Sequence, residues 1–241
     1  DPLWSRGLGD VYKRQPVDSE HFSIWSLIGD SNIDTCEKIY LTASGGPFRE
    51  TPPEEFAEIT VDQALKHPSW VMGRKITIDS ATMFNKGLEM IEARWLFGVE
   101  MDCVKVVVHP QSVVHSLVEY VDGSMIAQMS TPDMCLPIQY ALTHPERMAN
   151  QRVQTNLASI GTLQFEEPDS ERFPALDLAR RAGEVCGTLP AVFNAANEVA
   201  VDAFCEGKLS FLGITKLVSD VMDQHQVITH PDLTQILDSD Q

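Results

Sequence analysis

Asp18 and Glu20 are two carboxylates separated by a single residue, a spacing that can serve cation binding. In an extended segment, side chains at positions i and i+2 project from the same side of the backbone. Carboxylate oxygens are preferred ligands of hard divalent cations. A pair of this kind is equally common in a solvated turn or as a helix cap. A metal site therefore needs a third ligand.

Glu89 can supply that third carboxylate. It lies three residues after Lys86 in a stretch with helical periodicity, so the two side chains share roughly one side of the helix. The alternative is an i,i+3 ion pair with Lys86 on a solvent-facing surface, which is the commoner fate of helical glutamates. On the first interpretation, Asp18, Glu20 and Glu89 converge on one cation.

Donors for an anion occur in two separate segments. The apolar stretch 39–41 leads into Ser44-Gly45-Gly46, a strand followed by a loop whose backbone N–H groups can converge on an anion. A tight turn at the end of a strand is the alternative. Ser80, Asn85 and Lys86 bring hydroxyl, amide and ammonium donors to the start of a predicted helix, which favours phosphate binding. Ser80 can equally be an N-cap, and Lys86 a solvated surface residue.

The segment 67–73 places a tryptophan and a methionine in a loop flanked by proline and glycine. A tryptophan in such a loop often covers a ligand, because binding residues are concentrated on loops. The alternative is a loop packed onto the core.

The elements that must position these residues have recognisable patterns. The stretch from Lys75 predicts a short alternating strand ahead of Asp79-Ser80. Residues 85–97 carry Leu88, Ile91, Trp95 and Leu96 at helical spacing, and Gly98 can cap that helix. Residues 105–109 predict a buried strand. Residues 115–121 and 124–129 predict a hairpin with a type I′ turn at Asp122-Gly123.

These patterns predict an α+β domain with a mixed sheet and flanking helices, followed by an α-helical bundle. We expect a foreign tail at 1–15, the metal- and substrate-binding domain at 16–143, a polar linker at 144–172 and a truncated bundle at 173–241. Apolar residues at helical spacing define the bundle.

Composition excludes several classes of partner. The chain has 241 residues, with 18 Lys and Arg against 35 Asp and Glu, for a formal net charge of −17. Such an acidic molecule is unsuited to nucleic acid or anionic membrane surfaces. No apolar run approaches the roughly 20 residues of a membrane helix, and no signal-peptide core is present. The 5 widely spaced cysteines contain no C-x-x-C pair and predict a reduced, cytoplasmic protein.

Five segments together resemble one known family. They are PVDSEH (16–21), LTASGGPFRETP (41–52), HPSWVMGRKITIDSATMFNKGLEMIEARWLF (67–97), HPQSVVHS (109–116) and NAANEVAVDAF (194–204). In this order they resemble the 1-deoxy-D-xylulose 5-phosphate reductoisomerases, and the resemblance covers nearly everything from Pro16 on.

The resemblance implies an enzyme of three parts: an N-terminal Rossmann domain for NADPH, a central α+β catalytic domain and a C-terminal four-helix bundle. The first part is missing from this sequence, as is a substrate-contacting lysine that precedes the DSE motif in the family. We therefore expect a fragment that is inactive alone, from a bacterial cytoplasmic enzyme that is a homodimer at full length.

The resemblance also assigns roles to residues. It implies that the divalent cation, Mg²⁺, Mn²⁺ or Co²⁺, is held by Asp18, Glu20 and Glu89. It implies that substrate is bound by these two glutamates and by Ser19, Ser44, His67, Ser80, Asn85 and Lys86. Trp70 matches the residue that folds over the substrate, and His67 and Trp70 join the three carboxylates as catalytic residues. Met72 and Gly73 match positions that line the nicotinamide.

The implied reaction converts 1-deoxy-D-xylulose 5-phosphate into 2-C-methyl-D-erythritol 4-phosphate in the non-mevalonate isoprenoid pathway. A cation chelated by three carboxylates would polarise the C2 carbonyl and C3 hydroxyl for a rearrangement of the carbon skeleton, most simply a retro-aldol and aldol pair, before hydride transfer from NADPH. Two alternatives stay open from the residues: a metal-dependent sugar-phosphate enzyme of another reaction type, such as a phosphohydrolase, and a non-catalytic substrate-binding fragment.

Overall fold

The computed structural model describes residues 15–29, 33–67 and 72–241. The predicted foreign tail at 1–15 lies almost entirely outside these residues. Within them, one sheet is formed by four strands, β1 (Cys36–Ala43), β2 (Val104–Val108), β3 (Val114–Tyr120) and β4 (Met125–Met129). Their order is β2-β1-β3-β4. The β1–β2 pair is parallel and the other two pairs are antiparallel, so the predicted mixed sheet is confirmed.

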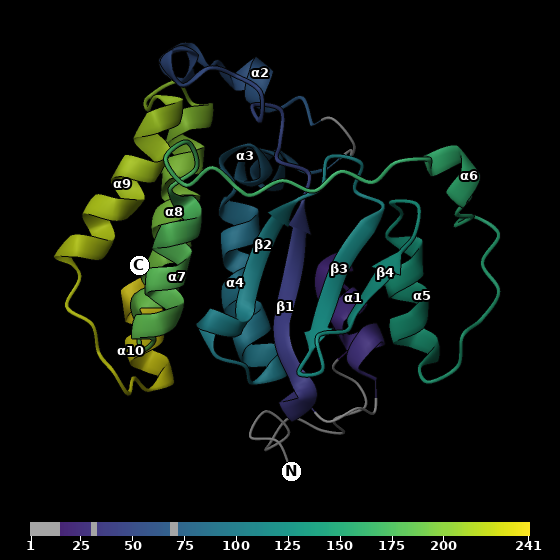
Figure 1. Cartoon of the computed structure of the whole chain (residues 1–241). Coiled ribbons are helices and arrows are strands. Elements are labelled where there is room, and N and C mark those ends of the chain that lie inside the picture. The colour runs from purple at the N-terminus through teal and green to yellow at the C-terminus, as the bar shows by residue number, and fades with distance from the viewer. Residues whose placement is uncertain (1–14, 30–32, 68–71) are drawn as a thin grey trace.

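Two helices cover one face of this sheet, α1 (Ser19–Ile28) and α4 (Phe84–Phe97) (Figure 1). Ile39 and Leu41 alternate along β1 and are fully buried against that helical layer. The layer carries both candidate acidic segments: α1 begins just after Asp18, and α4 contains Glu89. The sheet thus brings the start of α1 close to α4.

The strand predicted from Lys75 is wrong. These residues form α3 (Arg74–Thr82). Its buried positions include Thr77, Ile78, Ala81 and Thr82, a helical spacing, whereas the alternating Ile76 is exposed. Lys75 and Asp79 also pair one helical turn apart, at 2.6 Å. Packing of α3 against α4 and α8 (Leu189–Cys205) therefore overrides the short β-like alternation.

The helix predicted at 85–97 is confirmed as α4, and Gly98 caps it in the left-handed conformation at φ 67°. The expected apolar stripe is only partly buried: Trp95 is 62% exposed and Leu96 44% exposed. The buried side of α4 instead includes Lys86 and Glu89. Burial of these charged residues follows from the surrounding elements and not from the pattern of α4 itself.

The β3–β4 hairpin is confirmed, but its type I′ turn is wrong. Of the two predicted turn residues only Gly123 has positive φ, at 81°. The Gly123 N–H donates to the Tyr120 carbonyl at 2.8 Å, and the Tyr120 N–H donates to the Ser124 carbonyl at 2.8 Å. This is a three-residue loop in which one left-handed glycine follows an ordinary turn.

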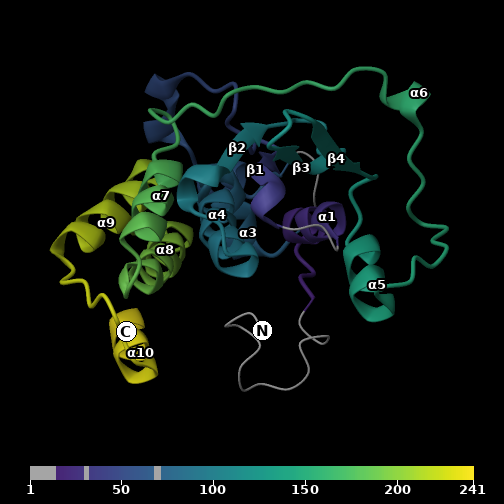
Figure 2. The ribbon, with the colours of Figure 1, turned by 60° about the horizontal axis from the view of Figure 1, so that its bottom comes forward.

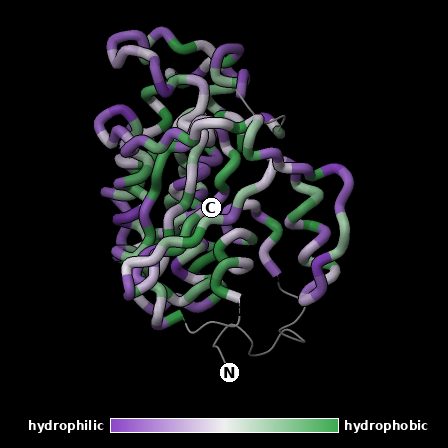
Figure 3. The backbone as a smooth tube through the Cα atoms, turned by 45° about the vertical axis from the view of Figure 1, so that its right-hand side comes forward, coloured by the Kyte–Doolittle hydropathy of each residue, from purple (hydrophilic) through white to green (hydrophobic). Residues whose placement is uncertain are grey.

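The predicted bundle consists of α7 (Ala175–Val185), α8 (Leu189–Cys205), α9 (Phe211–Gln224) and α10 (Leu233–Asp240). Figures 1 and 2 place α7–α9 beside α4, on the opposite side of the molecule from α5 (Cys135–Thr143). Figure 3 shows hydrophobic and hydrophilic residues interspersed along the backbone of the whole chain. The apolar sides of α7–α9 join the strands in one continuous core. The predicted α+β part followed by helices is therefore confirmed as a fold class.

Gly87 shows how closely the two parts approach. A methyl group at this position of α4 would lie 2.8 Å from the Ala179 Cβ of α7. Residues 144–172, with the short helix α6 (Leu157–Ile160), run from α5 across the end of the sheet to α7 (Figure 1). The remaining short elements are α2 (Val61–Ala64) and 3₁₀ turns at Ile33–Thr35, Pro53–Glu58 and Met101–Cys103. The described residues contain no helix long and apolar enough to cross a membrane.

Candidate functional site

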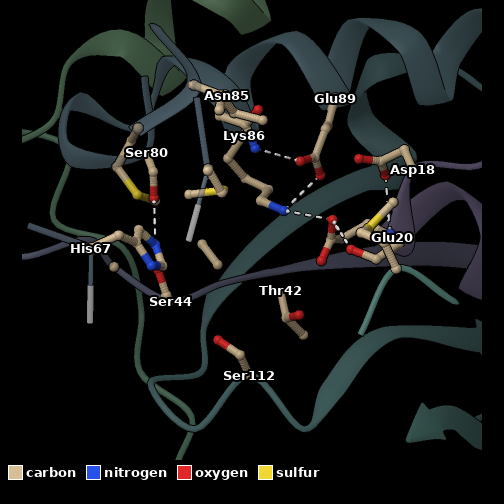
Figure 4. A pocket seen from close by; sticks show the side chains of 17 residues that line it. Asp18, Glu20, Thr42, Ser44, His67, Ser80, Asn85, Lys86, Glu89 and Ser112 are labelled. Atoms are coloured by element: carbon tan, nitrogen blue, oxygen red, sulfur yellow. Dashed lines mark hydrogen bonds and ion pairs between the residues drawn. The ribbon is translucent and has the colours of Figure 1, made fainter. Parts of the chain in front are cut away.

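A cavity of about 290 Å³ lies where the end of β1, the start of α1 and the junction between α3 and α4 meet. Figure 4 shows the side chains that surround it. Most of the predicted site residues line this cavity: Asp18, Ser19, Glu20, Ser44, His67, Met72, Ser80, Asn85, Lys86 and Glu89.

Asp18 and Glu20 are not in an extended segment, which corrects that expectation. Asp18 is the N-cap of α1, and one of its carboxylate oxygens accepts from the N–H groups of Glu20 and His21, each at 3.0 Å. Glu20 lies in the first turn of the helix. The N-terminus of α1 therefore holds the two carboxylates together. Asp18 is a helix cap, as in the alternative interpretation, and it still lines the cavity together with Glu20.

Glu89 reaches the same place from α4. Asp18, Glu20 and Glu89 each offer a ligand atom, and these atoms all lie within 4.8 Å of one another. The alternative of an ion pair is also observed, because the Lys86 ammonium lies 2.6 Å from Glu89 Oε2 and 3.5 Å from Glu20 Oε2. That pair is buried and faces the cavity, not solvent. The Asn85 amide also donates to Glu89 Oε1, at 2.7 Å.

The charges of this cluster are strongly coupled. Burial acts to raise the pKa of Glu20, but the Lys86 ammonium and His115 outweigh it, and the pKa falls to about 2. Burial acts to lower the pKa of Lys86, but the Glu20 and Glu89 carboxylates raise it above its usual value. Lys86 therefore stays charged and balances at least one carboxylate.

The other two carboxyl groups shift in the opposite direction. Burial raises the pKa of Glu89 well above its ordinary value, and the nearby Asp18 charge adds to the effect. Burial, followed by repulsion from Glu20, raises the pKa of Asp18. One ammonium does not compensate three ionised carboxylates, so Asp18 and Glu89 hold protons more readily than ordinary carboxyl groups. A divalent cation at these oxygens would favour the ionised form of both.

Two histidines complete the cluster, and neither was singled out from the sequence. His21 Nε2 contacts the Glu89 carbonyl oxygen at 3.0 Å, and its Nδ1 lies 3.2 Å from Asp18 Oδ1. His115 Nδ1 lies 3.8 Å from Glu20 Oε1. His21 thus ties α1 to α4 next to the carboxylates. The available signal was its position one helical turn after Asp18.

Ser44 and Ser80 form a second group with His67. The His67 Nε2 atom lies 3.1 Å from Ser44 Oγ and 3.0 Å from Ser80 Oγ. Burial lowers the pKa of His67 below its ordinary value, which favours the neutral ring. Ser80 lies inside α3 and is not an N-cap, so that alternative is wrong.

The glycine loop after β1 makes this arrangement possible. Gly46 has a φ of 66°, and a methyl group there would lie 2.8 Å from the Ser80 carbonyl oxygen. Only glycine allows the loop to approach α3 so closely. The loop and α3 thereby bring Ser44 and Ser80 to one wall of the cavity.

The predicted phosphate-binding residues share one cavity but not one hydrogen-bond network. Ser44 and Ser80 bond to His67, whereas Asn85 and Lys86 bond to the carboxylate cluster. Figure 4 shows these groups on adjacent parts of the cavity wall. An anion held by all four would therefore lie beside the cation site.

The remaining predicted residues lie at or near the cavity. The Ser19 hydroxyl donates to Glu20 Oε2 at 2.9 Å. Met72 lines the cavity, and Gly73 is the N-cap of α3 next to it. Trp70 lies outside the residues that the structure describes.

Known proteins match this chain along most of its length. Residues 15–97 match the family described as 1-deoxy-D-xylulose 5-phosphate reductoisomerase C-terminal domain, and residues 129–241 match DXP reductoisomerase C-terminal domain. A curated reductoisomerase of this name from Pelotomaculum thermopropionicum is 58% identical over 93% of this chain and 58% of its own length.

Solved structures agree. The reductoisomerase of Zymomonas mobilis, in complex with NADPH, aligns with a TM-score of 0.87 at 46% identity, over 93% of this chain and 58% of that one. A DOX-P reductoisomerase in complex with NADPH, fosmidomycin and magnesium also aligns at 0.87, with 41% identity, over 93% of this chain and 60% of that one. The chain thus spans about three fifths of the proteins it matches, and it belongs to the 1-deoxy-D-xylulose 5-phosphate reductoisomerase family.

Proposed function

We propose that this chain forms the metal- and substrate-binding part of an NADPH-dependent enzyme that converts 1-deoxy-D-xylulose 5-phosphate into 2-C-methyl-D-erythritol 4-phosphate in isoprenoid biosynthesis. The observation that carries the proposal is the placement of three convergent carboxylates beside hydroxyl, amide and ammonium donors in a single cavity. Metal-dependent chemistry on a sugar phosphate uses both: a cation site for its carbonyl and hydroxyl oxygens and an anion site for its phosphate.

Asp18, Glu20 and Glu89 would hold the divalent cation. Their clustered, buried oxygens and the raised pKa values of Asp18 and Glu89 fit a group that brings two positive charges. When bound, such a cation polarises a carbonyl oxygen and a neighbouring hydroxyl of the substrate. Lys86 and Asn85 then orient the substrate from the side of α4, and Ser19 lies within reach of its hydroxyl groups.

Ser44 and Ser80 would bind the phosphate with their hydroxyl groups, together with Asn85 and Lys86. His67 Nε2 lies within hydrogen-bond distance of both hydroxyls, and with this nitrogen protonated it would donate to a serine oxygen and leave the serine hydrogen for the phosphate. Because the phosphate lies away from the reacting carbons, its binding energy serves to position the sugar for the rearrangement. Met72 and Gly73, at the edge of the cavity, would contact the nicotinamide end of NADPH.

Calorimetric titration of the 241-residue chain with fosmidomycin, with and without Mg²⁺, tests the binding part of the proposal. We expect binding that requires Mg²⁺. Glu89→Gln removes one ligand charge and should weaken the Mg²⁺-dependent binding by at least about 10-fold. Glu100→Gln is the matched control, because Glu100 is exposed and pairs only with Arg94 among the described residues. Equal affinities of the two variants would contradict the assignment.

The reaction is tested by joining this chain to the N-terminal two fifths of the Pelotomaculum thermopropionicum relative. We expect oxidation of NADPH that depends on 1-deoxy-D-xylulose 5-phosphate. Release of inorganic phosphate without NADPH oxidation would favour a phosphohydrolase instead. Binding without either reaction would favour the non-catalytic alternative. A homodimer at full length and a location in the bacterial cytoplasm stay predictions.

A further inference from the structure

Ser112 is a buried cavity residue that no step above uses. It lies in the loop between β2 and β3, is 8% exposed, and lines the cavity together with Ser44, Ser80 and Lys86. In Figure 4 its side chain rises from below the cavity, with the oxygen turned toward the side of Ser44 and His67. Its hydroxyl has no hydrogen-bond partner among the described residues. A serine hydroxyl at a cavity wall can donate to an anionic oxygen of whatever the cavity binds.

The backbone of Ser112 is also unusual. Its φ is 51°, one of 3 positive values among the described non-glycine residues. A serine in this left-handed region is strained, and such strain persists only where the surrounding structure fixes it. In this conformation the Ser112 side chain lies at the cavity wall.

The segment 162–166 fixes this loop from outside. The His109 ring donates from Nδ1 to the Gln164 carbonyl oxygen at 2.7 Å and stacks on Phe165 with ring centroids 4.7 Å apart. The Gln111 amide donates to Gln164 Oε1 at 3.0 Å, and Val108 forms an antiparallel bridge with Glu166. The Ser112 N–H completes the turn by donating to the His109 carbonyl at 3.0 Å.

We infer that the Ser112 hydroxyl is a further donor to the anionic oxygens bound in this cavity, and that segment 162–166 positions it. The inference rests on the proposed function for the identity of the anion, a phosphate ester. Ser112 lies on a cavity wall separate from α3 and α4, so its hydroxyl closes the anion site from a third direction. Ser112 is a binding residue, and Gln111 is a positioning residue that acts through it.

Two substitutions separate the hydroxyl from the strain. Ser112→Ala removes the hydroxyl and keeps the strained backbone, whereas Ser112→Gly removes both. Calorimetry of the 241-residue chain with Mg²⁺ measures affinity for 1-deoxy-D-xylulose 5-phosphate and, separately, for inorganic phosphate. We expect both variants to lose about 10- to 100-fold in affinity for both anions, the range for a hydrogen bond to a charged group. Ser112→Gly should melt at or above the temperature of Ser112→Ala.

Ser124→Ala is the matched control, because Ser124 lies in the β3–β4 turn and its hydroxyl bonds to Asp122. It should leave both affinities unchanged. Gln111→Ala should weaken binding in the parent chain but add nothing in the Ser112→Ala background, which a merely structural role would not produce. Affinities of the Ser112 variants within twofold of the parent would overturn this inference alone. A parent chain that bound neither anion would overturn it together with the phosphate-binding part of the proposed function.

Discussion

The Lys86 ammonium lies between two carboxylates of the candidate cation site, and this position decides how the site behaves. It contacts Glu89 at 2.6 Å and Glu20 at 3.5 Å, where it partly neutralises a cluster that also contains Asp18. A divalent cation bound by the same oxygens would release Lys86 toward the anion. The two ligands of the proposed enzyme are therefore coupled through one side chain.

This coupling gives a prediction for Lys86→Met. Without added cation, the variant leaves buried carboxylates uncompensated and should lose about 3–5 kcal/mol of unfolding free energy, the cost of breaking a buried pair from one side. Saturating Mg²⁺ should restore much of this loss, because the cation supplies the missing charge. Thermal melts in EDTA and in Mg²⁺ measure the difference. Lys216→Met, which breaks an exposed pair with Asp220, serves as control. Equal Mg²⁺-induced shifts in both variants would contradict the prediction.

At this scale the sequence identified the carboxylates and donors but not their surroundings. Asp18 and Glu20 could be paired from their spacing, Glu89 from its place three residues after Lys86 in a predicted helix, and all three from the family resemblance. The burial of Lys86 could not be foreseen, since it depends on what packs around α4. Ser112 carries no signal in its residue type, because a strained φ is visible only in the folded loop.

The elements differ in how far their own sequence determines them. The hairpin and α4 follow their local patterns, including the glycine cap at 98. The helix α3 does not: five alternating residues resembled a strand, and contacts with α4 and α8 decided otherwise. The same packing holds the part of α3 that carries Ser80, because Asn197 of α8 donates to Asp79 at 2.8 Å. Short alternating runs are ambiguous because only tertiary contacts fix which side is buried.

The contact between His109 and segment 162–166 predicts that the stability of the chain depends on pH. His109 is fully buried, and its Nε2 atom has no partner among the described residues. Burial lowers the pKa of His109, although the bond to Gln164 acts against it and the nearby His115 acts with it. Because the folded-state pKa lies below the unfolded value of about 6.5, the folded chain binds fewer protons in that interval. Stability should therefore fall as the pH drops below about 6.5.

His109→Asn removes the titration while its amide can still donate to the Gln164 carbonyl. The variant should lose less stability than the parent between pH 7 and 5, by at most about 1.4 kcal/mol per pH unit. Urea unfolding at each pH measures the two slopes. His230→Asn, at a position exposed to solvent, is the control. Parallel slopes for the parent chain and His109→Asn would show that His109 does not titrate with unfolding.

The whole molecule combines the cavity of the proposed metal and sugar-phosphate site with two candidate contacts for the cofactor, Met72 and Gly73. The sheet, α4 and the C-terminal helices share one core. The division into a domain at 16–143, a linker at 144–172 and a bundle at 173–241 stays a prediction. The candidate cofactor contacts, Met72 and Gly73, lie at one end of α3.

This asymmetry predicts that the 241-residue chain binds ligands but does not turn over. Recognition of a dinucleotide uses a glycine-rich turn between a strand and a helix, which brings backbone donors to the pyrophosphate. Residues 1–241 contain no G-x-G-x-x-G, and the chain spans only about three fifths of its relatives. Met72 and Gly73 could contact only the nicotinamide end. Without the remote contacts, the hydride donor has no binding energy to orient it, so high NADPH concentrations should not restore the rate. The measurement is the absorbance of reduced nicotinamide with 1-deoxy-D-xylulose 5-phosphate and Mg²⁺, on chain that binds fosmidomycin. Substrate-dependent oxidation above background would mean that residues within this chain bind the whole cofactor, and that Met72 and Gly73 are only part of that site.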